Sequence, residues 1–310
     1  MSLTVDLHLH TTASDGMYSP AEIVAAACAR GLGVIAITDH DTLAGVEPAI
    51  AAAAGTPLCV MPGVELNALY ESHSVHLLGY GFDPGDPRLA ARLSGMRCSR
   101  EQRARLMVGM LADLGARISW DRVQALSQGT IARPHIARAL VEAGHAHDVA
   151  DAFARFIGDG CPAYLPSGRM SVSEALGVVR DAGGDVALAH AKLLHPGLDL
   201  KALLEVLCAA GLTGLEVYHS EHDEEATAEL RRVARERGLW WCGGSDFHGA
   251  TKPQARLGGV PIPPDVLEQG PFPRALAAAG GAKGHSDELS APATPGNDMF
   301  SRPDPARRSA

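Results

Sequence analysis

Short apolar runs alternate with amphipathic segments along most of the chain, a pattern typical of a parallel β-sheet covered by helices. Helical periodicity favours helices between most of these runs, and two runs follow each other too closely for a helix, so we expect a hairpin there. The fold class is therefore α/β, with a sheet that is mostly parallel. The predicted helices are 20–30, 46–54, 171–183, 200–210 and 224–237, and the seven predicted strands are 4–10, 34–37, 58–61, 75–79, 186–189, 214–218 and 239–242.

Residues 94–163 differ from the rest of the chain because they show helical periodicity and contain no lysine. They carry nine arginines against seven acidic residues, a net charge of +2. We predict that 94–163 form an inserted helical lid subdomain between two segments of one barrel domain, 1–93 and 164–275. Residues 276–310 are rich in Ala, Gly, Ser and Pro, which predicts a mostly disordered tail.

The net charge of the whole chain, -9, excludes the overall basic surface that drives unselective binding to nucleic acids or membranes. The N-terminus lacks the segments of a signal peptide, and no apolar run reaches the roughly 18 residues of a membrane span. The six cysteines lie far apart, in no pattern typical of zinc sites or secreted disulfide scaffolds. We therefore expect a cytoplasmic protein with no membrane partner and no stable nucleic-acid complex.

Residues that can bind metals recur at or just after the C-terminal ends of predicted strands, and one more, His76, sits within the fourth strand. Alone, each has a structural explanation, such as a buried core histidine or a turn aspartate. Together they indicate a site, because the loops at the C-terminal strand ends of such barrels converge. The nine candidate ligands are His8, His10, Asp15, His40, Glu65, His76, His190, Asp246 and His248.

The chemistry of these nine residues favours a cluster of cations. His8 and His10 share one face of a strand, and Asp246 and His248 repeat that spacing. Imidazoles and carboxylates without thiolates suit zinc, manganese or iron, and the ligands exceed the needs of one tetrahedral ion. We expect two to three divalent cations, with Mn²⁺ favoured and Zn²⁺ or Fe²⁺ as alternatives. Such a cluster can clamp a phosphoryl group and lower the pKa of water, which predicts phosphoester hydrolysis.

Several short motifs carry these residues: Asp6-Leu7-His8-Leu9-His10-Thr11 with Ser14-Asp15-Gly16, Ile37-Thr38-Asp39-His40-Asp41, Pro62-Gly63-Val64-Glu65, His76, Ala189-His190, and Gly244-Ser245-Asp246-Phe247-His248-Gly249. With them the sequence resembles the PHP (polymerase and histidinol phosphatase) family over residues 1–270. The resemblance implies a distorted (β/α)7 barrel and a metal-dependent phosphoesterase.

The resemblance also implies how the ligands divide among three metals. One metal takes His8, His10, Glu65 and Asp246; a second takes Glu65, His76 and His190; a third takes Asp15, His40 and His248. One departure concerns His190, which the family usually follows directly with proline. Here Ala191-Lys192-Leu193-Leu194 intervene before His195-Pro196, so the loop after the fifth strand differs.

Within the family, the chain is similar to the branch of 3′,5′-nucleoside bisphosphate phosphatases and 5′-3′ exoribonucleases. The matching features are Arg133-Pro134-His135-Ile136-Ala137-Arg138 and Glu216-Val217-Tyr218 followed by His222. Arginines three apart on a helix form one basic ridge that can bind phosphate, although a solvated helix face explains them equally well. We expect catalysis to involve Glu65, Asp246 and His222. The candidate substrate contacts are Arg97, Arg100, Arg133, His135, Tyr218, His219 and His222.

The sequence thus predicts an enzyme that hydrolyses the 3′-phosphate of 3′,5′-nucleoside bisphosphates, such as 3′-phosphoadenosine 5′-phosphate, so that its partner is a small nucleotide. A 5′-3′ exoribonuclease acting on short 5′-phosphorylated RNA is one alternative, and a histidinol-phosphate-type phosphatase is another. An inactive PHP scaffold module is an alternative of a different class. It is disfavoured because all nine ligand positions carry competent side chains.

Overall fold

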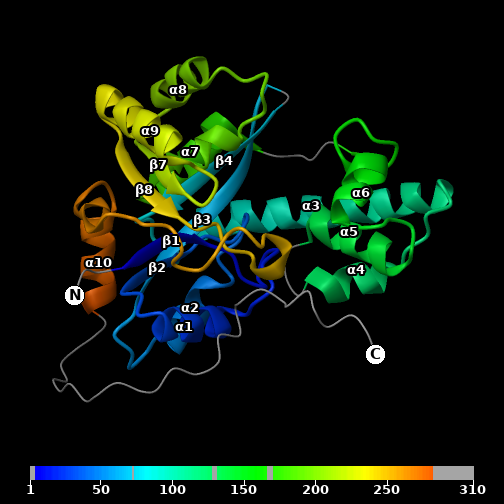
Figure 1. Ribbon diagram of the computed structural model, residues 1–310, viewed down its shortest axis with the longest axis horizontal. Helices are drawn as coiled ribbons and strands as arrows, with labels where there is room; N and C mark the ends of the chain where they lie inside the picture. The colour runs from blue at the N-terminus through cyan, green and yellow to red at the C-terminus, as the bar shows by residue number, and fades with distance from the viewer. Residues whose placement is uncertain (1–3, 72, 128–130, 166–169, 282–310) are drawn as a thin grey trace.

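The computed structural model describes residues 4–71, 73–127, 131–165 and 170–281. Within these residues, seven strands form a sheet in the order β1-β2-β3-β4-β6-β7-β8, and the short β5 pairs with β3 (Figure 1). The chain after β8 meets the end of β1, because the N–H of Asp246 donates to His8 O at 2.9 Å. The predicted seven-stranded barrel is therefore confirmed. The strands are β1 Val5–Leu9, β2 Val34–Ile37, β3 Cys59–Tyr70, β4 His73–Tyr80, β5 Met170–Ser171, β6 Asp185–Leu188, β7 Gly214–His219 and β8 Trp240–Gly244.

The barrel departs from a regular parallel one at β3 and β4. These strands form the predicted hairpin and pair antiparallel from Gly63↔Tyr80 to Tyr70↔His73, and β4 also runs antiparallel to β6. The prediction ended the third strand at Met61, but β3 continues to Tyr70 because the β4 ladder satisfies its backbone groups. Glu65 therefore lies within a strand rather than after one.

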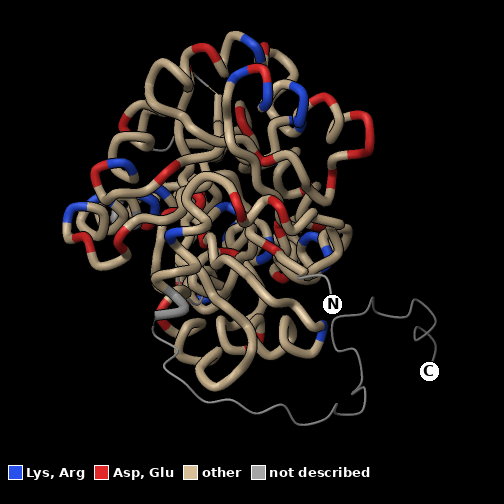
Figure 2. Tube along the Cα trace, turned by 90° about the vertical axis from the view of Figure 1, so that its left-hand side faces the viewer, with Lys and Arg blue, Asp and Glu red and all other residues tan. Residues whose placement is uncertain are grey.

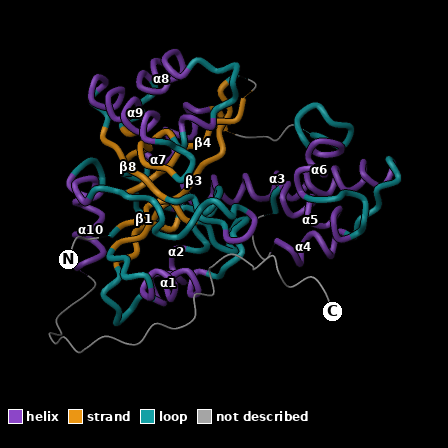
Figure 3. The backbone as a smooth tube through the Cα atoms, viewed as in Figure 1, coloured by secondary structure: helices purple, strands orange, loops and turns teal. Residues whose placement is uncertain are grey.

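Helices cover the outside of the barrel, and their starts follow the capping signals in the sequence (Figure 3). The Ser19 hydroxyl accepts from the N–H of Glu22, whose carboxylate accepts from the N–H of Ser19 at 2.7 Å. Ser171 and Glu174 repeat this capping box at the start of α7. The outer helices are α1 Pro20–Ala29, α2 Val46–Ala52, α7 Val172–Asp181, α8 Leu200–Ala209, α9 Glu224–Arg237 and α10 Phe272–Gly281.

The insertion forms a group of helices to one side of the barrel (Figure 1). It has its own apolar core, and we call it the lid. The long helix α3 joins the two units: Leu89 packs in the barrel core, whereas Met107 packs in the lid core. A boundary at residue 94 falls inside this helix, so the division there stays a prediction. The helices concerned are α3 Pro87–Asp113, α4 Trp120–Ser127, α5 Arg133–Glu142 and α6 Val149–Ala152, followed by a π-helical turn at Phe153–Ile157.

The C-terminal tail was expected to begin at residue 276, but α10 continues to Gly281. The remainder, 282–310, lies outside the described residues. Acidic and basic residues are interspersed along the chain trace (Figure 2). No helix of the described chain is both long and apolar enough to cross a membrane.

Candidate metal centre

The end of β1 brings two histidines to the mouth of the barrel. His8 lies in the strand and His10 follows it, and both side chains are fully buried. Their Nε2 atoms lie 3.2 Å and 3.0 Å from the same oxygen, Glu65 Oε2. Asp246 Oδ1 lies 3.6 Å from His8 Nε2 and 3.3 Å from His10 Nε2. The ligand atoms of these four residues all lie within 4.8 Å of one another.

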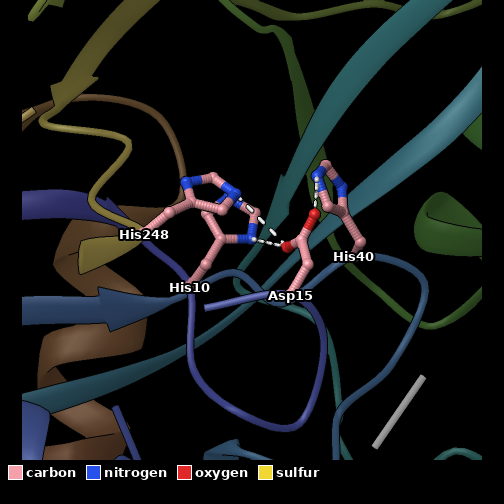
Figure 4. A group of neighbouring side chains, drawn as sticks. All are labelled: His10, Asp15, His40 and His248. Carbon is pink, nitrogen blue, oxygen red and sulfur yellow. Dashed lines mark ion pairs between the residues drawn. The ribbon is translucent and has the colours of Figure 1, made fainter. Parts of the chain in front are cut away.

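A second group lies on the other side of His10 and places three histidines around one carboxylate (Figure 4). Asp15 Oδ1 lies 3.2 Å from His248 Nε2 and 3.8 Å from His10 Nδ1, and Asp15 Oδ2 lies 3.9 Å from His40 Nε2. His10 therefore faces both groups. The family resemblance implied a place for His10 in the first group only.

The third group forms around the other oxygen of Glu65. His76 Nδ1 lies 2.7 Å and His190 Nε2 lies 3.1 Å from Glu65 Oε1. His40 also approaches this group, with its Nδ1 3.2 Å from Glu65 Oε2. The unusual loop after His190 does not move its ring away from the cluster. The structure thus brings all nine candidate ligands together, with Glu65 at their centre.

The donor set fits divalent cations. His10 Nδ1 and His190 Nδ1 are buried and have no hydrogen-bond partner within the described part of the chain. Most buried polar atoms in proteins have such a partner, so orphaned atoms in a cluster of imidazoles and carboxylates indicate metal ligands. The cluster can hold cations that bind a phosphoryl group and activate water.

The charges of the cluster also favour bound cations. Burial opposes ionisation of Glu65, but His40, His76 and His8 outweigh it and hold the pKa of Glu65 well below its usual range. Burial would lower the pKa of His10, but Asp246 and Glu65 raise that pKa to about 10. The carboxylates therefore attract positive charge to the cluster, whether as protons on imidazoles or as metal ions.

Glu216, a residue that the sequence reasoning did not assign to the site, orients two of the histidines. It is fully buried in β7, and its carboxylate lies 3.0 Å from His8 Nδ1 and accepts from the N–H of His190 at 2.7 Å. A proton on His8 Nδ1 leaves Nε2 free to bind a metal. His8 overcomes the effect of burial and lowers the pKa of Glu216 to about 2. The sequence feature that could have identified Glu216 is its position in the middle of an apolar strand.

Buried aspartates hold the ligand loops by accepting backbone N–H groups. Asp39 accepts from the N–H of Thr11 at 2.7 Å and from the hydroxyl of Ser14 at 2.6 Å, next to Asp15.

The structure also gives a positive φ to His190 (25°) and Asp246 (54°). This conformation is costly for residues other than glycine, and such strain is typical of functional sites.

His219 and Lys252 also contact Asp246. The Nδ1 of His219 accepts from the N–H of Glu221 at 3.1 Å, so its Nε2 donates to Asp246 Oδ2 at 3.3 Å. Lys252 Nζ lies 2.5 Å from the same oxygen and lines a cavity of about 750 Å³ above the cluster, which we call the central cavity. His219 was predicted to contact substrate, but the structure buries it against a candidate ligand.

Arginines of the lid line a second, smaller cavity of about 190 Å³. We call it the arginine pocket, because Arg100, Arg103 and Arg133 form part of its lining. Three candidate metal ligands also line it: Asp15, His40 and His76. Arg100 pairs with Asp41, and Arg133 donates to Asp159 Oδ1 at 2.7 Å. Arg103, a member of the arginine ridge expected from the sequence, donates to Leu165 O.

Other predicted substrate contacts lie elsewhere. Tyr218 and His222 line a separate cavity of about 650 Å³ beside α9, which we call the α9 pocket, and none of the nine candidate ligands lines it. His135 is buried, and its Nδ1 accepts from the N–H of Ala132 at 3.0 Å at the start of α5. The side chain of Arg97 lies outside the described residues. The sequence could not separate these locations, because local spacing does not specify how α3, α5 and β7 lie relative to the cluster.

Comparison with known proteins agrees with this site. Residues 6–112 match the PHP domain. The chain is 35% identical to the 3′,5′-nucleoside bisphosphate phosphatase of Chromobacterium violaceum, over 79% of this chain and 87% of that protein. It is 34% identical to the 5′-3′ exoribonuclease of Haemophilus influenzae, over 80% of this chain and 91% of that protein. A solved structure assigned as a metal-dependent phosphoesterase, from Bifidobacterium adolescentis, superimposes with a TM-score of 0.79 at 35% identity, covering 86% of this chain and 95% of the other.

Identity at this level over most of both chains shows the family. The chain belongs to the PHP family of metal-dependent phosphoesterases. It is therefore a hydrolase, and its buried His, Asp and Glu cluster is where metal can bind.

Proposed function

We propose that this protein removes the 3′-phosphate of nucleoside 3′,5′-bisphosphates with two to three divalent cations, Mn²⁺ first and Zn²⁺ or Fe²⁺ as alternatives. The observation that carries the proposal is the contact between two anion-binding features, the metal cluster and the arginine pocket, which share three side chains. A substrate with phosphates at both ends of a ribose needs two such features side by side. The relative from Chromobacterium violaceum, named for this substrate class, supports the proposal.

The side chains of the protein have separate tasks in this proposal. Glu65 and Asp246 hold the cations, which would neutralise charge on the reacting phosphate and activate water. Arg100 and Arg133 hold the 5′-phosphate, because one guanidinium group can donate two parallel hydrogen bonds to two phosphate oxygens. Both arginines already contact carboxylates, so the phosphate must compete with those contacts. His222 faces the α9 pocket and takes no part in the reaction as proposed.

A second candidate is a 5′-3′ exoribonuclease, and one observation favours it. Arg138 lines both the central cavity and a further cavity of about 210 Å³ that also contains Arg122. Positive groups therefore continue from the central cavity into this further cavity, where RNA beyond the first nucleotide could lie. The same P–O3′ bond would break in both reactions. The two candidates differ only in whether the 3′-phosphate carries another nucleotide.

The deciding experiment compares three substrates with the metal-loaded protein: 3′-phosphoadenosine 5′-phosphate, adenosine 3′-phosphate and a short 5′-phosphorylated RNA. We expect kcat/KM for the bisphosphate to exceed that for adenosine 3′-phosphate by at least about tenfold, the worth of one charge-assisted phosphate contact. A ratio near one would remove the second anion site. Faster digestion of the RNA than of the bisphosphate would favour the exoribonuclease.

Metal analysis tests the cofactor part of the proposal. Protein prepared without chelator should hold two to three transition-metal ions per chain, since the ligands form three overlapping groups. Added Mn²⁺ should raise the activity of partly loaded protein. A full complement of one ion with no gain from Mn²⁺ would contradict the cluster. We further propose a cytoplasmic location, which the widely spaced cysteines support.

A further inference from the structure

The α9 pocket has the dimensions of a small-molecule site that is separate from the metal centre. Its volume of about 650 Å³ lies within the usual range for ligand pockets. One wall is α9, and the other is formed by the end of β7, the residues that follow it, and 259–261. None of the nine candidate ligands lines it, and it has no lining residue in common with the arginine pocket. The proposed reaction therefore leaves this cavity without a use.

Four polar atoms around this pocket are buried and have no hydrogen-bond partner among the described residues. They are Tyr218 OH, Ser220 Oγ, His222 Nε2 and Arg231 Nε. Tyr218 is only 8% exposed, so its hydroxyl pays a desolvation cost that a ligand can offset. The hydroxyl groups of Tyr218 and Ser220 and the guanidinium group of Arg231 can each donate a hydrogen bond. His222 Nε2 accepts, because His222 Nδ1 donates to Val217 O at 2.9 Å.

The charges that face the pocket favour an anion. Arg231 and Arg235 are one turn apart on α9, and their guanidinium groups lie 5.6 Å and 5.8 Å from the centre of the Trp241 ring. Arg235 forms no ion pair with another described residue, and the only acidic contact of Arg231 is Asp265 at 3.9 Å.

Asp223, Glu224 and Glu236 are the acidic residues on the same wall, and Asp223 and Glu236 are engaged elsewhere. Glu236 accepts from Arg232 at 2.7 Å. The Asp223 carboxylate caps the helix by accepting from the N–H of Ala226 at 2.8 Å. Two guanidinium groups therefore remain available for a ligand.

We propose that the α9 pocket binds a small phosphate monoester that carries a hydroxyl group. The phosphate oxygens accept from Arg231, Arg235 and the hydroxyl groups of Tyr218 and Ser220, and the ligand hydroxyl donates to His222 Nε2. A phosphate suits these groups better than a carboxylate, because it offers three oxygens to several converging donors.

Trp241 provides a direct measurement, because the two arginines lie over its ring. We would titrate metal-loaded protein with ribose 5-phosphate, with inorganic phosphate as the minimal probe and ribose as the uncharged control, and follow tryptophan emission. We expect a saturable change with the two phosphates and none with ribose. R231A and R235A should each weaken binding by at least about tenfold. R232A, on the same helix but paired with Glu236, should stay within about threefold.

Two further variants separate this site from the substrate site. W241F should abolish the emission change while calorimetry still detects ribose 5-phosphate binding. R133A, in the arginine pocket, should bind ribose 5-phosphate at Trp241 as the wild type does. No response up to about 10 mM ligand, beyond the millimolar range expected for such contacts, would overturn the proposal. Loss of the response in R133A but not in R231A would also overturn it, by assigning the binding to the substrate site.

Discussion

The barrel mouth and the lid carry polar groups in opposite ways. At the mouth, ligands such as His8 and Glu65 are buried and are surrounded by carboxylates and backbone N–H groups that fix their positions. In the lid, Arg133 and Arg155 are partly exposed and pair with surface aspartates. Buried, mutually bonded groups lose more when one member is removed than exposed ion pairs do. This difference supports the proposed division, in which the barrel carries the chemistry and the lid recognises phosphate.

The largest effect should come from the centre of the barrel cluster. E65Q removes the charge that belongs to two of the three ligand groups, so kcat should fall by well over about 100-fold and bound metal should decrease. Metal analysis and steady-state kinetics would measure both. E71Q, at the exposed turn of the β3–β4 hairpin, is the matched control and should change neither. An E65Q enzyme that keeps more than a tenth of the activity would contradict the central position of Glu65.

A smaller effect is expected at Glu216, which contacts His8 and His190 but is not itself a candidate ligand. E216Q keeps the shape of the side chain but weakens the hydrogen bond that orients His8, so metal affinity should fall about 10- to 100-fold. Titration of metal-free protein with Mn²⁺ would measure this change. E205Q, an exposed glutamate on α8, should bind Mn²⁺ like the wild type. Unchanged affinity in E216Q would mean that β1 alone orients His8.

In the lid, R133A should alter recognition rather than chemistry. We expect KM for the bisphosphate to rise by about tenfold or more, with kcat changed much less, because in the proposed binding mode the arginine contacts the phosphate that does not react. The effect on adenosine 3′-phosphate, which lacks that phosphate, should be small. R155A, a lid arginine paired with Asp151 outside the arginine pocket, is the control. Equal losses of R133A with both substrates would refute the proposed role.

The smallest effect concerns the stability of the lid at acid pH. Burial, with a further contribution from Arg138, lowers the pKa of His135 to about 4. The unfolded chain therefore binds the proton first, and the free energy of unfolding should fall as pH drops from 6.5 toward 4. At pH 5.5 the loss is about 1.4 kcal/mol.

H135N keeps an acceptor for the N–H of Ala132 but cannot titrate. Urea unfolding at pH 7.5 and 5.5 should show a smaller pH dependence in this variant than in the wild type. H147N, in which an exposed lid histidine is replaced, should retain the pH dependence of the wild type. An identical pH dependence in H135N and the wild type would show that His135 does not make the lid acid-sensitive.

Much of the fold and of the cluster was predictable because the signals are local. The capping boxes at Ser19 and Ser171 start helices where predicted, and the two-residue spacing of His8 and His10 puts both rings on one face. The end of β3 was not predictable, since its second half depends on a ladder with β4. The arginine pocket depends on how α3 and α5 lie against the barrel, which no local pattern specifies.

The sequence by itself determined the class of fold, the nine clustered polar residues and the family they belong to. Spacing along a strand and the position of a residue at a strand end decide which side chains reach the barrel mouth. Only the tertiary structure decided that Glu216 supports His8, that Lys252 reaches Asp246, and that Tyr218 and His222 face a different pocket. These contacts join residues from separate strands and loops, so they arise only when the barrel closes and the elements around it pack.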